Sequence, residues 1–147
     1  MYVFDSDHLS LLQQGTGAEY EVLARRCQTS PAAAFFVTII SFHEQFSGWT
    51  AFIGRAQNAA SLVRGYTRLE AVIETFARAQ VLPFSAAAAD IYDDLRQHRV
   101  RVGSMDLRIA SIAIANPMTL LTRNQVDFAR VPGLQFEDWT LPPHQEP

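Results

Sequence analysis

Acidic side chains follow the ends of several strand-like apolar runs, and carboxylates gathered in this way can hold a metal ion. Asp5 directly follows the first apolar run of the chain, and Glu44 lies a few residues beyond the second. Asp127 follows the run that ends at Thr122, and Asp106 opens the apolar helix-like segment before that run. Since ligands of an open α/β sheet bind outside the carboxyl ends of its strands, these four acids are expected to converge on one rim of the sheet.

Clustered carboxylates repel one another unless they are protonated or bridged by a cation. A hard divalent ion is the simplest solution, because Mg²⁺ takes oxygen ligands and keeps several waters. Carboxylates that hold one or two such ions can generate a hydroxide and stabilise the leaving oxygen of a phosphodiester. Each acid also has a purely structural explanation; Asp106, for example, would be stabilised at any helix N-terminus. A purely structural explanation fits Asp5 least well, because acids are rarely buried without a partner.

The elements that must position these acids alternate between strands and helices. The strand-like runs are continuously apolar, which is typical of a mostly parallel sheet covered on both faces. The sequence therefore predicts an α/β sandwich. The expected strands cover residues 2–4, 34–40, 81–84, 119–122 and 135–137, and the expected helices begin near residues 6, 18, 41, 51, 66, 86 and 104.

Local signals predict where several helices start and stop. Ser6 or Asp7 is expected to cap the first helix, and Ser104 the helix that carries Asp106. Ser41 is expected to open the third helix. Gly65 is expected to separate two helices within the long helical stretch of residues 51–79, and residues 123–133 are expected to form a polar loop.

Length and composition limit the kind of protein. The chain has 147 residues, 48% of them hydrophobic and 18% charged, which favours one globular domain over residues 1–140 and a disordered tail over residues 141–147. The single cysteine, Cys27, excludes an internal disulfide and a Cys-rich zinc site and indicates a reducing compartment. No apolar stretch is long enough to cross a bilayer. A cytoplasmic protein without membrane contact is expected.

The charge inventory excludes several mechanisms. All twelve basic residues are arginine, so no Walker lysine, lysine Schiff base or phosphoryl-binding lysine exists. The net charge of −3 disfavours nucleic-acid binding, since phosphates attract a positive surface. Without the four clustered acids, however, eleven acids face twelve arginines, so the rest of the surface permits RNA binding.

Several motifs occur in a fixed order along residues 2–139. With these motifs the chain resembles the PIN-domain ribonucleases, and more closely the VapC toxins of bacterial toxin–antitoxin pairs. The motifs are Asp5-Ser6-Asp7 with Ser10, the run 38–44 ending at Glu44 with Gly48 beyond it, Gly103-Ser104-Met105-Asp106-Leu107-Arg108-Ile109-Ala110, Leu120-Leu121-Thr122-Arg123-Asn124, Asp127-Phe128, Val131-Pro132-Gly133-Leu134 and Asp138-Trp139.

The resemblance implies a PIN-like three-layer α/β/α sandwich with a mostly parallel sheet of about five strands. It also implies an endoribonuclease dependent on Mg²⁺ or Mn²⁺, acting on RNA of the tRNA or rRNA class, inhibited by a cognate antitoxin and assembled as a homodimer. The implied ligands and catalytic residues are Asp5, Glu44, Asp106 and Asp127, supported by Ser6, Asp7, Thr122 and Asn124. Arg108 and Arg123 are candidates for contacts with RNA phosphates. Asp7 departs from the family's usual asparagine, His43 beside Glu44 is unusual, and the sequence leaves open whether Asn124 or Asp127 lies closer to the metal.

Two other functions remain open at this stage. The Asp5-x-Asp7 pattern also resembles the nucleophile motif of haloacid-dehalogenase-type phosphatases, with Asp5 as nucleophile, although their usual lysine is missing. A catalytically silent PIN-like scaffold that only binds a partner is the non-enzymatic alternative. A hydrolase built from Ser6, His8 and Asp5 is disfavoured, because all three lie within one turn and no Gly-x-Ser-x-Gly elbow exists. His8, His98 and His144 are expected at the surface, and Phe52, Tyr66 and Phe76 in core or dimer contacts.

Overall fold

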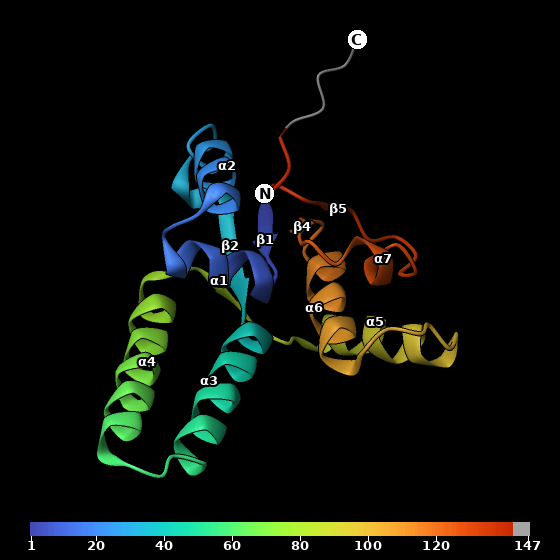
Figure 1. The fold of residues 1–147 in the computed structure, drawn as a ribbon. Coiled ribbons are helices and arrows are strands. Elements are labelled where there is room, and N and C mark those ends of the chain that lie inside the picture. The colour runs from blue at the N-terminus through green and yellow to red at the C-terminus, as the bar shows by residue number, and fades with distance from the viewer. Residues whose placement is uncertain (143–147) are drawn as a thin grey trace.

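A five-stranded parallel sheet lies at the centre of the computed structural model, which describes residues 1–142 (Figure 1). The strand order is β3-β2-β1-β4-β5, so the first strand of the chain is the middle strand of the sheet. In register, Val3 lies beside Phe36 on one side and beside Leu120 on the other. The strands are β1 (Tyr2–Phe4), β2 (Phe35–Thr38), β3 (Val81–Leu82), β4 (Thr119–Leu121) and β5 (Phe136–Glu137).

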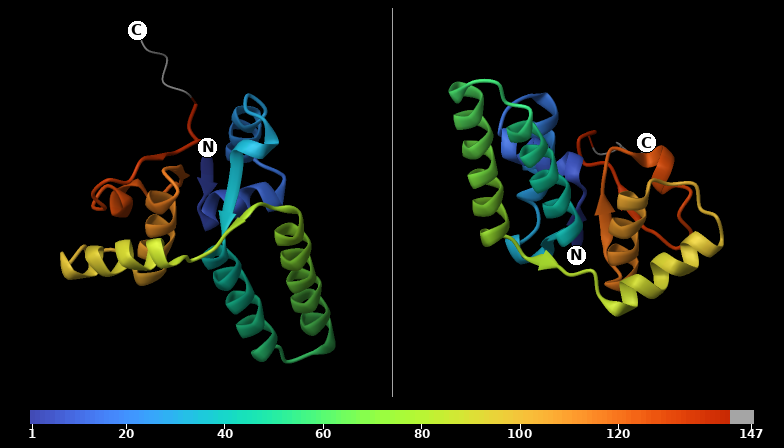
Figure 2. Two further views of the ribbon diagram at one scale, coloured as in Figure 1. Left: turned by 180° about the vertical axis from the view of Figure 1, so that it is seen from behind. Right: turned by 90° about the horizontal axis from the view of Figure 1, so that it is seen from below.

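Helices cover both faces of this sheet, as the sequence predicted. On one face Val3 and Leu120 pack against α5 and α6, and on the other Phe4 and Leu121 pack against α1, α2 and α4. Figure 2 shows the α3–α4 pair and the α5–α6 pair on opposite sides of the strands. The three-layer prediction is confirmed. The helices are α1 (Ser6–Gln14), α2 (Ala18–Cys27), α3 (Ile39–Gly54), α4 (Ala59–Arg78), α5 (Ala86–Gln97), α6 (Ser104–Ala115) and α7 (Gln125–Phe128), with a 3-10 turn at Ala32–Ala34.

Several predicted helix boundaries are wrong by a few residues. Asp5, not Ser6 or Asp7, caps α1. Thr38 caps α3 by accepting a hydrogen bond from the Ser41 backbone N–H, so the helix begins at Ile39 and β2 is correspondingly shorter. Ser104 lies inside α6 instead of capping it. The loop expected over residues 123–133 contains α7.

Gly65 does not separate two helices, because it lies within α4. The break falls between Gly54 and Asn58, where the Asn58 side chain caps α4. A Cβ at Gly65 would lie 2.6 Å from Cγ1 of Ile53, so the missing side chain lets α4 approach α3 closely. The two helices form a hairpin that projects from the sheet, which we call the α3–α4 arm (Figure 1).

We expect Gly65→Ala to lower the free energy of unfolding by about 1 kcal/mol or more. Overpacking costs about 1–3 kcal/mol, and the better helix propensity of alanine returns at most about 1 kcal/mol. Gly48→Ala in α3 is the matched control, because nothing lies within 4 Å of its Cβ position and propensity alone should stabilise it. Urea unfolding of both variants measures the difference; a stabilised Gly65→Ala would contradict the close packing.

Two further points concern the limits of the described chain. Of the tail expected over residues 141–147, residues 143–147 lie outside the described residues, while the Leu141 carbonyl accepts a hydrogen bond from Arg26. Within residues 1–142, no helix is both long and apolar enough to cross a membrane.

Candidate active site

Asp5 is the most deeply buried acid of the predicted cluster, with 6% of its surface exposed. It ends β1 and caps α1, so its position follows from both elements. The Ser6 backbone N–H donates to its Oδ1 at 2.8 Å, and the Thr122 hydroxyl donates to its Oδ2 at 2.8 Å. Burial, followed by the negative charges of Asp7 and Asp106, raises the pKa of Asp5 from 3.8 to about 7 despite these two hydrogen bonds.

Glu44 reaches the same place from α3. The Ser6 hydroxyl donates to Glu44 Oε1 at 2.9 Å, which joins the first turn of α1 to the second turn of α3. The buried Thr38 and Ser41 fix the start of α3 through the cap. The direction of α3 thereby sets where Glu44 lies.

Asp106 enters the cluster from the first turn of α6. Burial and then the negative charges of Glu44, Asp127 and Asp7 raise the pKa of Asp106, and a hydrogen bond from Asn124 partly opposes them. Each of these acids therefore makes ionisation of Asp106 harder. Acids from four separate segments of the chain, Asp7, Glu44, Asp106 and Asp127, thus lie in one neighbourhood.

Asn124 lies between Asp106 and Asp127. Its Nδ2 is 3.0 Å from Oδ2 of Asp127 and 3.5 Å from Oδ2 of Asp106, while its Oδ1 accepts from the Asp127 backbone N–H. Asp127 also forms an ion pair with Arg130 at 3.2 Å. Asn124 thus occupies the inner position between the two carboxylates, and Asp127 already has a positive partner.

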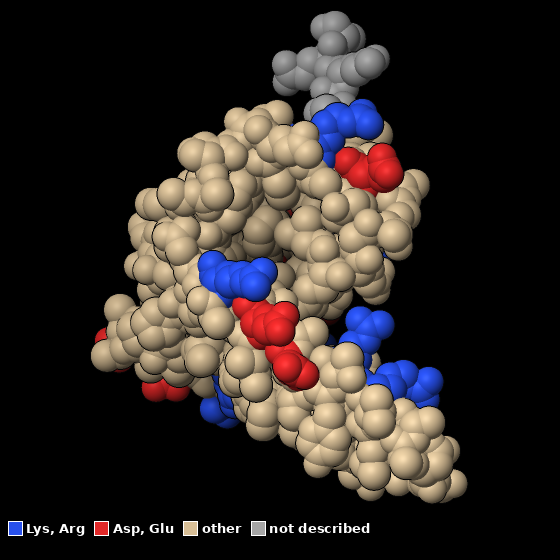
Figure 3. All heavy atoms as spheres, turned by 90° about the vertical axis from the view of Figure 1, so that its left-hand side faces the viewer, with Lys and Arg blue, Asp and Glu red and all other residues tan. Residues whose placement is uncertain are grey.

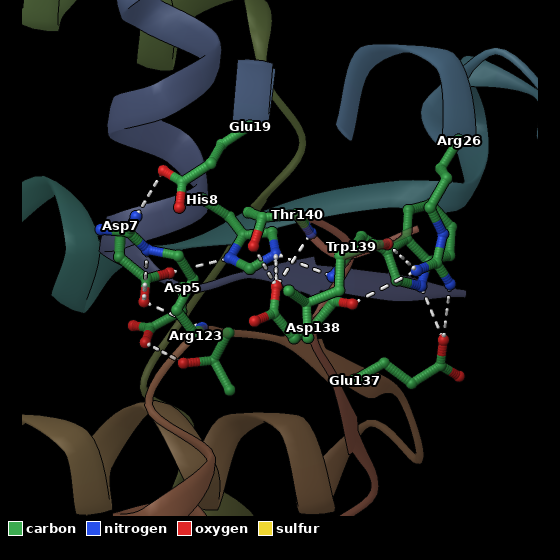
Figure 4. Close-up of polar contacts among 12 residues, drawn as sticks. Asp5, Asp7, His8, Glu19, Arg26, Arg123, Glu137, Asp138, Trp139 and Thr140 are labelled. Carbon is green, nitrogen blue, oxygen red and sulfur yellow. Dashed lines mark hydrogen bonds and ion pairs between the residues drawn. The ribbon is translucent and has the colours of Figure 1, made fainter. Parts of the chain in front are cut away.

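His8 is completely buried, so its predicted place at the surface is wrong. Its Nδ1 lies 2.9 Å from Oδ1 of Asp7, and its Nε2 accepts a hydrogen bond from the Trp139 backbone N–H (Figure 4). Neutral histidine protonated at Nδ1 satisfies both contacts. Asp138 Oδ1 lies 3.6 Å from the same Nε2. The segment after β5 therefore closes over the first turn of α1, which the local sequence around His8 does not reveal.

Asp7 and Arg123 form the outer side of the cluster. Burial alone would raise the pKa of Asp7, but the hydrogen bonds from His8 and from the Arg123 backbone N–H together lower it below its ordinary value. The Arg123 guanidinium pairs with Glu19 at 2.7 Å, so part of its charge is engaged within the chain (Figure 4). Of the other histidines, His98 is exposed as expected and His144 lies outside the described residues.

The donor chemistry of the cluster fits a hard divalent cation. Asp5, Glu44 and Asp106 have no ion-pair partner anywhere in residues 1–142, and they offer only oxygen atoms. As the side chains stand, no three His, Cys, Asp or Glu groups of the described chain come close enough together to hold an ion. Binding would therefore require the carboxylates to rotate toward the ion.

Comparison with known sequences gives matches over part of the chain, although no protein-family model matches. Over 66 residues the chain is 41% identical to the ribonuclease VapC2 of Rickettsia felis, a segment that covers 42% of this chain and 49% of that protein. Over 75 residues it is 40% identical to a tRNA(fMet)-specific endonuclease VapC of Shigella flexneri, covering 48% of this chain and 57% of that protein. The chain thus spans about half the length of the curated relatives it matches.

Comparison with solved structures extends the likeness to the whole fold. The crystal structure of VapBC2 from Rickettsia felis superimposes with a TM-score of 0.68 at 22% identity, covering 94% of this chain and 98% of that chain. VapBC-1 of nontypeable Haemophilus influenzae gives 0.72 at 22% identity, covering 95% and 98%. The chain is similar to VapC ribonucleases over about half of their length. At these identities the structures establish the PIN-like fold, while the sequence matches carry the likeness to VapC.

The VapC-like chain brings together most of the residues predicted for its site. Asp5, Glu44, Asp106 and Asp127 influence one another or share hydrogen-bond partners. Ser6, Thr122 and Asn124 form hydrogen bonds with them, and the charge of Asp7 raises the pKa of Asp5 and of Asp106. Two residues were missed in the sequence: His8, and Trp139 as its partner. Arg108 lies near Tyr92, away from the carboxylates of this cluster.

We expect His8→Ala to destabilise the VapC-like chain by about 2–4 kcal/mol. The substitution leaves a cavity, and the Asp7 carboxylate and the Trp139 backbone N–H each lose the hydrogen bond that they form with His8. His98→Ala, at an exposed histidine, is the matched control and should change stability little. Thermal unfolding compares them; equal melting temperatures would mean that the buried contacts of His8 contribute nothing.

Proposed function

We propose that this chain is a metal-dependent endoribonuclease and the toxin of a toxin–antitoxin pair. The observation that carries the proposal is the group of three acids, Asp5, Glu44 and Asp106, which lie in one neighbourhood and have no ion-pair partner in the described chain. Proteins seldom hold such acids together without a cation to offset the repulsion. The likeness to VapC ribonucleases supports the same activity.

In this proposal, Asp5, Glu44, Asp106 and Asp127 hold one or two Mg²⁺ or Mn²⁺ ions. Such an ion supplies a means to deprotonate a water at neutral pH and to stabilise charge on the leaving oxygen of the RNA. Thr122 and the Ser6 backbone N–H orient Asp5, and the Ser6 hydroxyl orients Glu44. Asn124 lies between Asp106 and Asp127 and donates a hydrogen bond to each carboxylate. Asp127, paired with Arg130, is the weakest of the four candidates.

The substrate and partners follow from the relatives. The Shigella flexneri relative is a tRNA(fMet)-specific endonuclease, and a toxin–antitoxin complex from Klebsiella pneumoniae has a TM-score of 0.65 to this chain. We therefore propose RNA of the tRNA or rRNA class as substrate, an antitoxin protein as inhibitor, and a homodimer as the assembled form. The proposal places the protein in the cytoplasm, with its RNA.

The test is cleavage of total bacterial RNA by the purified protein freed from any bound inhibitor, with and without Mg²⁺, followed by sequencing of new 5′ ends. Discrete cuts should disappear on chelation and in Asp106→Asn. Asp90→Asn, which removes an exposed acid from α5, is the matched control and should cut normally. Identical cutting by wild type and Asp106→Asn would overturn the mechanism, and no cutting by either would favour the scaffold alternative.

A further inference from the structure

A cavity of about 420 Å³ opens between α5 and α6, beside the first turn of α6, the turn that carries Asp106. The half-buried Tyr92 and the exposed Arg96 line it from α5. The guanidinium carbons of Arg96 and Arg108 lie 5.6 and 5.9 Å from the centre of the Tyr92 ring. The remaining lining residues are Val100, Val102, Ser104 and Leu107. An aromatic ring with two guanidinium groups over it thus borders this open space.

The charge around this cavity is positive and unneutralised. Arg96, Arg99, Arg101 and Arg108 form no ion pair with any residue in 1–142, whereas Arg26, Arg123 and Arg130 each do. Of the three acids of α5, Asp90 and Asp94 line a different cavity, which Ile114 and Pro132 share, and Asp93 forms no ion pair with any arginine of residues 1–142. The face on the left-hand side of Figure 1 shows both basic and acidic groups, several of them next to one another (Figure 3).

The cavity lies at the same helix end as Asp106. Ser104 and Leu107 line it, and Asp106 lies between them in sequence on the first turn of α6. At 100° per residue, Asp106 points to the other side of α6, so about one helix diameter, roughly 10 Å, separates the two places. A strand has to pass around α6, a path of roughly 16 Å or half the circumference of the helix, and a stacked strand advances about 3.4 Å per nucleotide. A strand held at Asp106 therefore reaches the cavity within about five nucleotides.

We propose that Tyr92, Arg96 and Arg108 form a subsite for a single-stranded nucleotide that flanks the cleaved bond; the proposal rests on the RNA-cleaving function of the neighbouring acids. Bases stack on aromatic rings and on guanidinium planes, and this stacking tolerates any base. Arginine binds phosphate through paired hydrogen bonds. The subsite therefore provides affinity and register without reading sequence, and unpaired RNA fits it better than a duplex.

Binding, measured apart from cleavage, tests this subsite. The probe is a fluorescently labelled mixed-sequence RNA of about ten nucleotides, added to the full chain in chelator, with anisotropy read over a range of salt concentrations. Arg96→Gln should weaken binding about tenfold and reduce the slope of log K against log salt by about 0.7, the value for one phosphate contact in a single strand. Tyr92→Leu should weaken binding about tenfold or more, and Tyr92→Phe should bind like wild type.

Matched controls separate local effects from general ones. Arg55→Gln removes an exposed arginine between the helices of the α3–α4 arm, and Tyr20→Leu removes a half-buried tyrosine from α2; both should bind like wild type. Tyr92 also packs against Phe84, so thermal unfolding accompanies every variant, and Arg96→Gln carries the test if Tyr92→Leu unfolds.

The outcomes distinguish this subsite from the proposed function. Binding that is lost in Arg96→Gln and kept in Arg55→Gln supports the subsite, even where the wild type cuts no RNA. Wild-type binding by both Arg96→Gln and Tyr92→Leu overturns it, even where cleavage depends on Asp106. Equal losses in Arg96→Gln and Arg55→Gln also overturn it, because the effect is then one of net charge.

Discussion

Asp5→Asn is expected to make the metal-free protein more stable above pH 7 while abolishing RNA cleavage. The pKa of Asp5 rises from 3.8 to about 7 in the folded chain, so ionising it there opposes folding. A group of this kind stabilises the fold most fully below pH 4, and that contribution is lost as the pH rises through 7. At about 1.4 kcal/mol per pKa unit, the loss reaches about 4 kcal/mol. Asparagine avoids it, because it carries no charge.

The measurement is thermal unfolding of wild type and Asp5→Asn from pH 4 to pH 8.5 in chelator. The wild type should lose stability between pH 4 and pH 7, and the two melting curves should diverge across that range. Cleavage by Asp5→Asn should fall by more than about a hundredfold, since even partners of metal ligands are worth about 10–100-fold. Asp90→Asn, the exposed control, should match wild type in both assays. Lower stability of Asp5→Asn at pH 8 would mean that the buried charge is already compensated.

Divalent metal is expected to reverse the instability that the acids create. At a Mn²⁺ concentration one hundred times the dissociation constant, binding to the folded state alone adds about 2.7 kcal/mol of stability. For a chain of this size, that shift corresponds to a rise of roughly 5–10 °C in melting temperature. The rise should vanish in Asp106→Asn and remain in Asp90→Asn.

The same binding should depend on pH in a defined direction. Metal ligands must be deprotonated, and the pKa of Asp5 is about 7, so the apparent dissociation constant should rise about tenfold for each pH unit below 7. Calorimetric titrations with Mn²⁺ at pH 5.5, 6.5 and 7.5 measure this trend, and an equal concentration of NaCl controls for screening. An affinity that does not change with pH would exclude Asp5 as a ligand.

The acids of the site could be predicted from sequence, because the order of the strands and the residues that follow each strand are enough to locate them. Asp5 and Glu44 follow β1 and β2, and the carboxyl ends of adjacent parallel strands share one edge. The α/β sandwich was predictable on the same grounds, since continuous apolar runs indicate strands buried on both faces; its PIN-like form was implied by the resemblance of the motifs.

What the sequence did not predict depends on contacts between distant residues. His8 is buried because Trp139, 131 residues later, returns beside β1, and nothing near His8 announces this. Gly65 looks like a helix break, yet it serves close packing against Ile53, which only the three-dimensional arrangement of the α3–α4 arm shows. Helix caps shifted by one to three residues because a cap is defined by backbone geometry as well as by side-chain type.

The strand order also sets when during synthesis the site becomes complete. A ribosome makes β1 first, yet β1 lies in the middle of the sheet and pairs with β4, which is made more than a hundred residues later. Thr122, which holds Asp5, and Trp139, which holds His8, leave the ribosome after almost everything else in the described chain. A growing chain therefore carries Asp5 and Glu44 long before it carries Thr122 and Trp139, so a prematurely terminated chain would lack an assembled centre.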